Sequence, residues 1–88
     1  MNEVRDVILD AVREHLDLDR EGFEILKAKG RLDELTAVDS LLMVELVLTL
    51  EERFNIRFKA EDIDAELINE LDRLAAFVAE ALTREEAG

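Results

Sequence analysis

The sequence predicts an all-α fold in one small domain. Apolar residues recur at intervals of three and four in several segments, which is the spacing of one helix face. The chain contains no proline and only three glycines, so few residues interrupt a helix. The alternation of apolar and polar residues that marks a half-buried strand is absent. With 88 residues there is room for a single core, and we expect residues 1–88 to form one domain.

The first helix is predicted to make about four turns between Val4 and Leu16. Its apolar face contains Val4, Val7, Ile8, Ala11, Val12 and Leu16.

Residues 17–38 form a long connector, and a structureless loop of that length is uncommon in a compact domain. Lys27 and Lys29 stand just before Gly30, a combination typical of the end of a short helix. The apolar residues expected to hold the connector on the core are Phe23, Ile25, Leu26, Leu32 and Leu35.

The second long helix is predicted from Ser40 to Phe54, with Asp39 as its N-cap. At 100° per residue, one stripe of this helix is apolar and should face the core. That stripe consists of Met43, Leu46, Val47, Leu50 and Phe54.

The opposite side of the same helix mixes two leucines with two carboxylates, and we call it the outer strip: Leu41, Glu45, Leu48 and Glu52. Two interpretations are open from the periodicity alone. In the first, the strip has no binding role, and its leucines either contact a neighbouring helix or are singly exposed, as leucines often are. In the second, the strip docks a partner, with apolar groups for affinity and acids for steering.

A short third helix is predicted at about 61–69, where Ile63 and Leu67 lie one turn apart. A fourth helix follows, although neither glycine nor proline separates the two. Its apolar positions are Leu71, Leu74, Ala75, Val78 and Leu82.

Charge and composition exclude several classes of function. Eleven basic and twenty-three acidic residues give a net charge of −12, which repels nucleic-acid phosphates and favours basic protein surfaces. No cysteine is present, so the chain has no disulfide, no thiolate metal site and no thiol of its own. The N-terminus has no signal-peptide core, and no apolar run could span a bilayer. We therefore expect a cytoplasmic protein. The start at Met1 and the charged "TREEAG" end suggest a free-standing protein, which we expect to be a monomer.

Ser40 is the only serine of the chain. A serine next to an N-cap aspartate most often takes part in capping. A catalytic nucleophile is a poor alternative, because the flanks are not Gly-x-Ser-x-Gly and His15 is the only available base. A third interpretation is an attachment point, where a phosphodiester would meet the positive end of a helix dipole.

The segment "VDSLLMVELVLTLEERFNI" resembles the signature helix of acyl carrier proteins. It has the Asp-Ser-Leu tripeptide, then Val44-Glu45-Leu46, then Leu50-Glu51-Glu52-Arg53-Phe54 at the family spacing. The resemblance continues over nearly the whole chain, including the long connector and "IRFKAEDID" before the short third helix.

This resemblance implies an up-and-down four-helix bundle with a short third helix. It also implies that Ser40 carries phosphopantetheine, transferred from coenzyme A by a separate phosphopantetheinyl transferase. The chain would then not be an enzyme: acyl groups would be held as thioesters on this arm and presented to loading and synthase enzymes with basic docking surfaces. An aminoacyl or peptidyl carrier would use the same arm, and the acidity of the chain leans only slightly toward the acyl type.

In this family, the helix that begins at the serine meets the basic surfaces of partners. The positions that match it here are Asp39, Leu41, Glu45, Glu51 and Glu52, and Leu48 joins them through the outer strip. Three residues depart from the family pattern. Ala37 replaces a usual glycine, Leu42 a polar residue and Lys59 a frequent proline, which suggests specialised partners.

A calcium-binding loop is the alternative from another class of protein. "DLDREG" (17–22) places acids at positions 1, 3 and 5 and a glycine at position 6 of an EF-hand loop. The bidentate glutamate required at position 12 is Ala28, and the apolar position 8 is Glu24. Such a loop would bind calcium weakly, and no metal ligand is assigned.

Overall fold

The computed structural model describes residues 2–87, and the surroundings of the side chains of residues 3–84. Five α-helices and two short 3₁₀ turns make up the described chain, in which no strand occurs. In chain order they are α1 (Asn2–Leu16), α2 (Arg20–Lys29), η1 (Leu32–Glu34), α3 (Ser40–Phe54), η2 (Ala60–Asp62), α4 (Ala65–Asn69) and α5 (Leu71–Ala87). The all-α helical bundle predicted from the sequence is confirmed.

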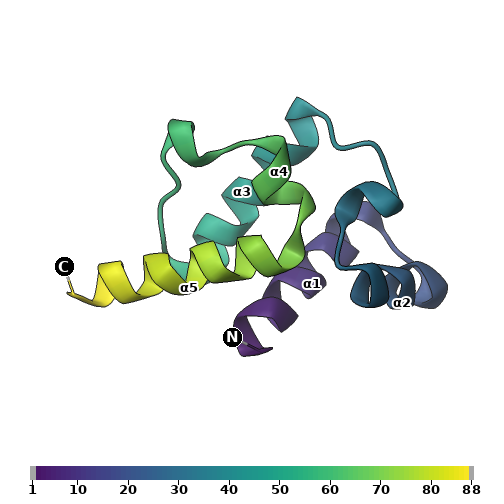
Figure 1. The fold of residues 1–88 in the computed structure, drawn as a ribbon, viewed down its shortest axis with the longest axis horizontal. Coiled ribbons are helices and arrows are strands. Elements are labelled where there is room, and N and C mark those ends of the chain that lie inside the picture. The colour runs from purple at the N-terminus through teal and green to yellow at the C-terminus, as the bar shows by residue number, and fades with distance from the viewer. Residues whose placement is uncertain (1, 88) are drawn as a thin grey trace.

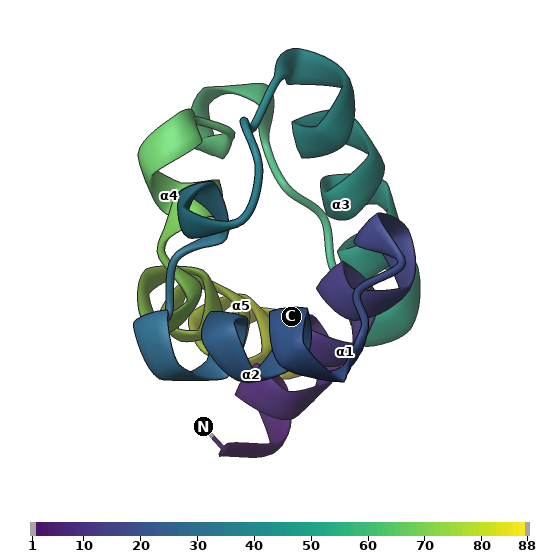
Figure 2. The same ribbon diagram turned by 90° about the vertical axis from the view of Figure 1, so that its right-hand side faces the viewer.

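Helix α1 lies between its two main neighbours, packing against α5 on one side and α3 on the other, while the short α4 packs on α5 (Figures 1 and 2). Helix α2 and η1 lie at one end of the bundle in Figure 1, so the connector wraps that end and then leads to the start of α3. The start of α3 therefore directly follows the connector and lies away from the middle of the bundle (Figure 1).

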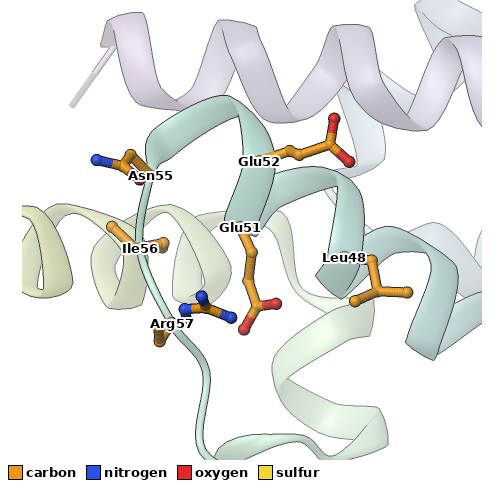
Figure 3. Close-up of a pocket in the computed structure, with 6 residues that line it drawn as sticks. All are labelled: Leu48, Glu51, Glu52, Asn55, Ile56 and Arg57. Carbon is orange, nitrogen blue, oxygen red and sulfur yellow. The ribbon is translucent and has the colours of Figure 1, made fainter.

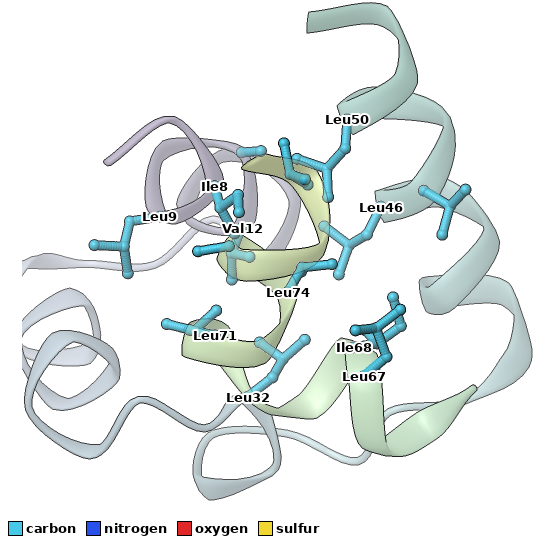
Figure 4. Close-up of a cluster of buried hydrophobic side chains, with 14 of the residues drawn as sticks. Ile8, Leu9, Val12, Leu32, Leu46, Leu50, Leu67, Ile68, Leu71 and Leu74 are labelled. Atoms are coloured by element: carbon cyan, nitrogen blue, oxygen red, sulfur yellow. The ribbon is translucent and has the colours of Figure 1, made fainter. Parts of the chain in front are cut away.

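One continuous core forms where α1, η1, α3, α4 and α5 converge (Figure 4). The largest fully buried side chains are Ile8, Val12, Leu26, Leu32, Leu46, Leu50, Ile68, Leu71, Leu74 and Val78. On α3, Leu46, Val47 and Leu50 are buried, while Met43 and Phe54 pack against the core from half-buried positions. The predicted core stripe of this helix is confirmed, with its two ends less buried than its centre.

The connector is largely helical, as Lys27, Lys29 and Gly30 predicted. Gly30 ends α2 with a φ of 69°, a left-handed conformation that glycine adopts without strain, and its N–H donates to the Leu26 carbonyl. Of the expected anchors, Leu26 and Leu32 are buried and Phe23 and Leu35 pack at the edge. The prediction for Ile25 is wrong: its side chain is 38% exposed on the outer face of α2.

The predicted third helix at 61–69 is wrong in its first half. Residues 60–62 form the 3₁₀ turn η2, and α4 begins only at Ala65. The reason is Asp64, whose extended backbone and side-chain bond to the Leu67 N–H (2.8 Å) make it the N-cap of α4. In the structure, the boundary before the fourth helix falls at Glu70. This residue has an extended backbone and forms an isolated antiparallel bridge with Arg31.

Candidate functional site

Ser40 is the first residue of α3, and its side chain is exposed. The N-cap is the residue before it: the Asp39 Oδ1 atom accepts a hydrogen bond from the Leu42 N–H at 2.8 Å. The Asp39 carbonyl also accepts from the Met43 N–H at 3.1 Å. Asp39 alone therefore supplies the capping contacts, and Ser40 is not needed for them.

The hydroxyl groups of this chain differ in what they bind. There is no tyrosine, so the hydroxyls are those of Ser40 and three threonines. Thr49 donates to the Glu45 carbonyl at 2.9 Å, and Thr83 to the Ala79 carbonyl at 3.1 Å. Thr36 makes a longer contact of 3.5 Å to the Ala37 carbonyl. Within the described residues, only the Ser40 hydroxyl has no hydrogen-bond partner, and its side chain is exposed, so it is free to react with a reagent from outside.

The position of Ser40 suits an attached phosphate group. Helix N-termini carry free backbone N–H groups and the positive end of the helix dipole, both of which stabilise an anion. The first turn of α3 holds Leu41, Leu42 and Met43 and contains no acidic side chain that would compete for this end. The residues present therefore fit a phosphodiester on the Ser40 oxygen, beside the Asp39 carboxylate that caps the same helix end.

The outer strip lies on the surface, as the docking interpretation requires. Leu41 is 66% and Leu48 55% exposed, and Glu45 and Glu52 are exposed as well. The alternative in which these leucines pack on a neighbouring helix is therefore wrong.

Val44 extends this apolar surface and was missed in the sequence analysis. Its side chain is 50% exposed, three residues after Leu41 and four before Leu48, so the three form one apolar row along α3. The signal was in the sequence, because Val44 lies only about 60° around the helix from Leu41 at 100° per residue.

Two side-chain contacts connect the outward side of α3 to the end of α1, and the second of them is an ion pair. The His15 Nε2 atom lies 4.0 Å from Glu45 Oε1, and Arg53 Nη2 lies 2.8 Å from Glu14 Oε2. All four side chains are partly exposed, so each contact contributes little to stability. Their effect on the site is to place a histidine and a second acid beside the outer strip.

The carboxyl-terminal end of α3 borders a hollow of about 420 Å³ (Figure 3). It is lined by Leu48, Glu51, Glu52, Asn55, Ile56 and Arg57. Glu51 and Glu52 point in different directions in this view. Glu52 is exposed, whereas Glu51 is half-buried and its Oε2 atom accepts from the Phe58 N–H at 2.8 Å. Of the two acids, Glu52 is the one free to meet a partner with both oxygens.

The calcium-loop alternative does not have the required shape. Residues 20–29 are helical, whereas an EF-hand loop wraps its ligands around the ion over most of this stretch. Asp19 caps α2 instead, with its Oδ1 atom accepting from the Gly22 N–H at 2.8 Å. Across residues 3–84, no group of three or more histidine or acidic side chains gathers in a way that could hold a metal ion.

Comparison with protein families gives one match. A family model described as "Phosphopantetheine attachment site" matches residues 6–78, which extend from α1 into α5 and contain Ser40 and the whole of α3. Comparisons with curated proteins and with solved structures found no match. In the part of the chain that the structure describes, no helix is long and apolar enough to cross a membrane.

Proposed function

This chain belongs to the phosphopantetheine attachment-site family, whose domains carry that group covalently, and we propose that Ser40 is the residue that carries it here. The observation that supports this most directly is the exposed Ser40 hydroxyl, the one hydroxyl without a partner among the described residues. When bound, the group supplies a thiol on a long flexible arm, on which acyl groups are held as thioesters.

We further propose that the chain is an acyl carrier and not itself an enzyme. Its own residues would position the arm: Asp39 caps α3, and the N-terminus of this helix stabilises the phosphate. The transferase and the loading and synthase enzymes would then bind the outer strip, including the free carboxylate of Glu52, together with Val44 and Asp39. The exposed leucines support this role because a partner can bury them. The acids support it because a domain with a net charge of −12 attracts basic surfaces. The single domain over 1–88, the cytoplasmic location and the free-standing, monomeric state stay predictions.

Arm attachment is tested with unmodified protein, coenzyme A, Mg²⁺ and a broad-specificity phosphopantetheinyl transferase. We expect the intact mass to rise by one phosphopantetheine and one titratable thiol to appear, in a chain that has no cysteine. The Ser40→Ala variant is the matched control, because it keeps Thr36, Thr49 and Thr83 and should gain neither. A parent protein left unmodified, in a reaction that modifies a known carrier, would refute the proposal.

The cargo is tested on protein isolated from its native host. Its intact mass should exceed that of the arm-bearing protein by an acyl group. A load with the mass of an amino acid or peptide would instead show an aminoacyl or peptidyl carrier.

A further inference from the structure

A cluster of basic side chains stands apart from the acidic surface of α3. Arg57, Lys59 and Arg84 line a second hollow of about 330 Å³ together with Asp62 and Ala81. We call this group of three cations around one acid the basic hollow. Local positive charge of this kind is unusual in a chain whose net charge is −12.

The basic hollow is built by packing between two segments that are distant in the sequence. In the extended stretch after α3, Ile56 and Phe58 are buried and Arg57 and Lys59 are exposed, the alternation of an extended backbone. The Phe58 ring stacks on Phe77 of α5, with the ring centroids 5.0 Å apart. This contact holds the stretch beside the middle of α5, as the ribbon in Figure 1 shows.

Arg84 reaches the same place from α5. Phe77, Ala81 and Arg84 are spaced by four and three residues, so they share one face of the helix. The small Ala81 is 4% exposed and lines the hollow together with the three cations. The stacking of Phe58 on Phe77 therefore brings the two segments together without any contact between the long basic side chains.

Within residues 3–84, none of these three cations forms an ion pair or lies over an aromatic ring. Arg5, Lys27, Arg31, Arg53 and Arg73 form ion pairs, and Arg13 lies over the Phe23 ring. Within residues 3–84, five basic side chains have neither kind of contact: Arg20, Lys29, Arg57, Lys59 and Arg84. Three of the five gather in one hollow, where they are available to a ligand.

The hollow is better suited to several carboxylates than to one phosphate. Phosphate sites commonly use free backbone N–H groups, but two of the N–H groups beside this hollow are already directed at carboxylates. The Phe58 N–H donates to Glu51, and the Lys59 N–H is directed at the Asp62 carboxylate at 3.4 Å. The three cations also come from two different segments, so they are spread around the hollow. Several carboxylates spaced along a peptide can each meet one of these cations.

We propose that the basic hollow is a second docking surface, which binds an acidic segment of a partner protein. Arg57 lines both hollows, so this surface adjoins the acidic end of α3. A partner that fits both must carry a basic patch next to an acidic segment. Such a mixed pattern sets the orientation of docking and rejects partners that are basic throughout, which a purely acidic helix would accept. The inference goes beyond the proposed function and does not require Ser40 to be modified.

The test is a titration of ¹⁵N-labelled full-length protein with a capped hexaglutamate peptide, followed by backbone amide shifts. At about 0.1 M ionic strength the Debye length is about 10 Å, which screens repulsion from the acidic remainder of the chain. We expect saturating shifts at 57–62 and 81–84. A capped hexalysine peptide should instead shift amides of α3 around Glu45 and Glu52.

Matched double variants separate a site from general attraction. K59Q/R84Q should weaken hexaglutamate binding by roughly tenfold, the sum of two exposed ion pairs. R20Q/K29Q makes the same change in net charge on α2 and should leave binding as in the parent. All four side chains are exposed, so both variants should keep the parent's circular dichroism and melting curve.

Three results would overturn the proposal. The first is the absence of saturating shifts with hexaglutamate, and the second is an equal loss of binding in both double variants. The third is inorganic phosphate producing the same shifts at the same concentration, which would show a small-anion site. Failure here leaves arm attachment at Ser40 intact, because that reaction is measured separately by mass.

Discussion

The carboxylate of Glu51 accepts a hydrogen bond from the backbone N–H of Phe58, with 2.8 Å between Glu51 Oε2 and the nitrogen. This bond ties the last turns of α3 to the stretch that follows it, seven residues later. Phe58 in turn stacks on Phe77, so the end of α3 is anchored to α5 through one side-chain acceptor. An acid that the family pattern assigns to partner docking therefore has a structural role in this chain.

Replacing Glu51 by alanine should destabilise the fold. The part-buried Phe58 N–H would lose its acceptor, and we expect the free energy of unfolding to fall by about 1–3 kcal/mol. Urea denaturation followed by circular dichroism measures this. Glu51→Gln keeps an acceptor oxygen and should lose less. Glu52→Ala, the exposed neighbour, should stay within about 0.5 kcal/mol of the parent. Equal stability of the Glu51→Ala and Glu52→Ala variants would contradict the structural role.

Capping of α3 should depend on Asp39 and not on Ser40. Asp39→Ala removes the acceptor of the Leu42 N–H and should cost about 1 kcal/mol, in the usual range for a lost N-cap. Ser40→Ala should change the free energy of unfolding by less than about 0.5 kcal/mol, because alanine is a good helix former and no described contact is lost. The comparison is made by thermal and urea unfolding of both variants. A larger loss for Ser40→Ala than for Asp39→Ala would mean that the cap is assigned to the wrong residue.

The outer strip should contribute to docking in two distinguishable ways. Glu52→Lys should raise the KM of the carrier for a phosphopantetheinyl transferase, and high salt should reduce the effect because steering is screened. Leu48→Ala should raise the KM by roughly fivefold at any salt concentration, since about 1 kcal/mol of apolar burial is lost.

Controls for docking come from α2, away from the strip. Glu21→Lys reverses an exposed charge, and Ile25→Ala truncates an exposed apolar side chain. Both should leave the KM as in the parent. If all four variants match the parent, the outer strip is a solvated surface and takes no part in docking.

Arg31 should govern the titration of Asp33. Two hydrogen bonds of 3.0 Å from the Arg31 guanidinium hold the pKa of this carboxyl below its ordinary value. Since the folded-state pKa is depressed, the stabilising contribution is complete above the unfolded-state pKa and is lost as the pH falls through the folded-state value. In Arg31→Gln we expect the pKa of Asp33 to rise toward its ordinary value, measured by NMR titration of the carboxyl carbon.

Arg73→Gln is the control for this titration. Arg73 approaches Glu66 and Glu70, as Arg31 does, but has no ion pair with Asp33. The pKa of Asp33 should therefore stay depressed in Arg73→Gln. An equal rise in both variants would show that the general charge of this region, and not the Arg31 hydrogen bonds, sets the value.

Where the signal is local, the sequence predicted the structure residue by residue. Helix α3 begins and ends at Ser40 and Phe54 as expected, because the Asp39 cap directly precedes the helix and the apolar stripe runs along it to Phe54. Gly30 ends α2 for the same kind of reason. Asp64 was an equally local signal for the start of α4, and it was overlooked because Ile63 and Leu67 fit a longer helix.

The sequence by itself determined the helical class, the position of Ser40 at a helix start and the mixed acidic and apolar character of the outer side of α3. Each depends on side-chain chemistry within one to four turns. Only the tertiary structure showed that this side is exposed, that Glu70 forms a bridge with Arg31, 39 residues away, and that Glu51 serves as an acceptor. The basic hollow is of the same kind, since Lys59 and Arg84 meet only because Phe58 stacks on Phe77. Contacts between residues so far apart depend on how the helices pack together, and no pattern within a single segment contains that information.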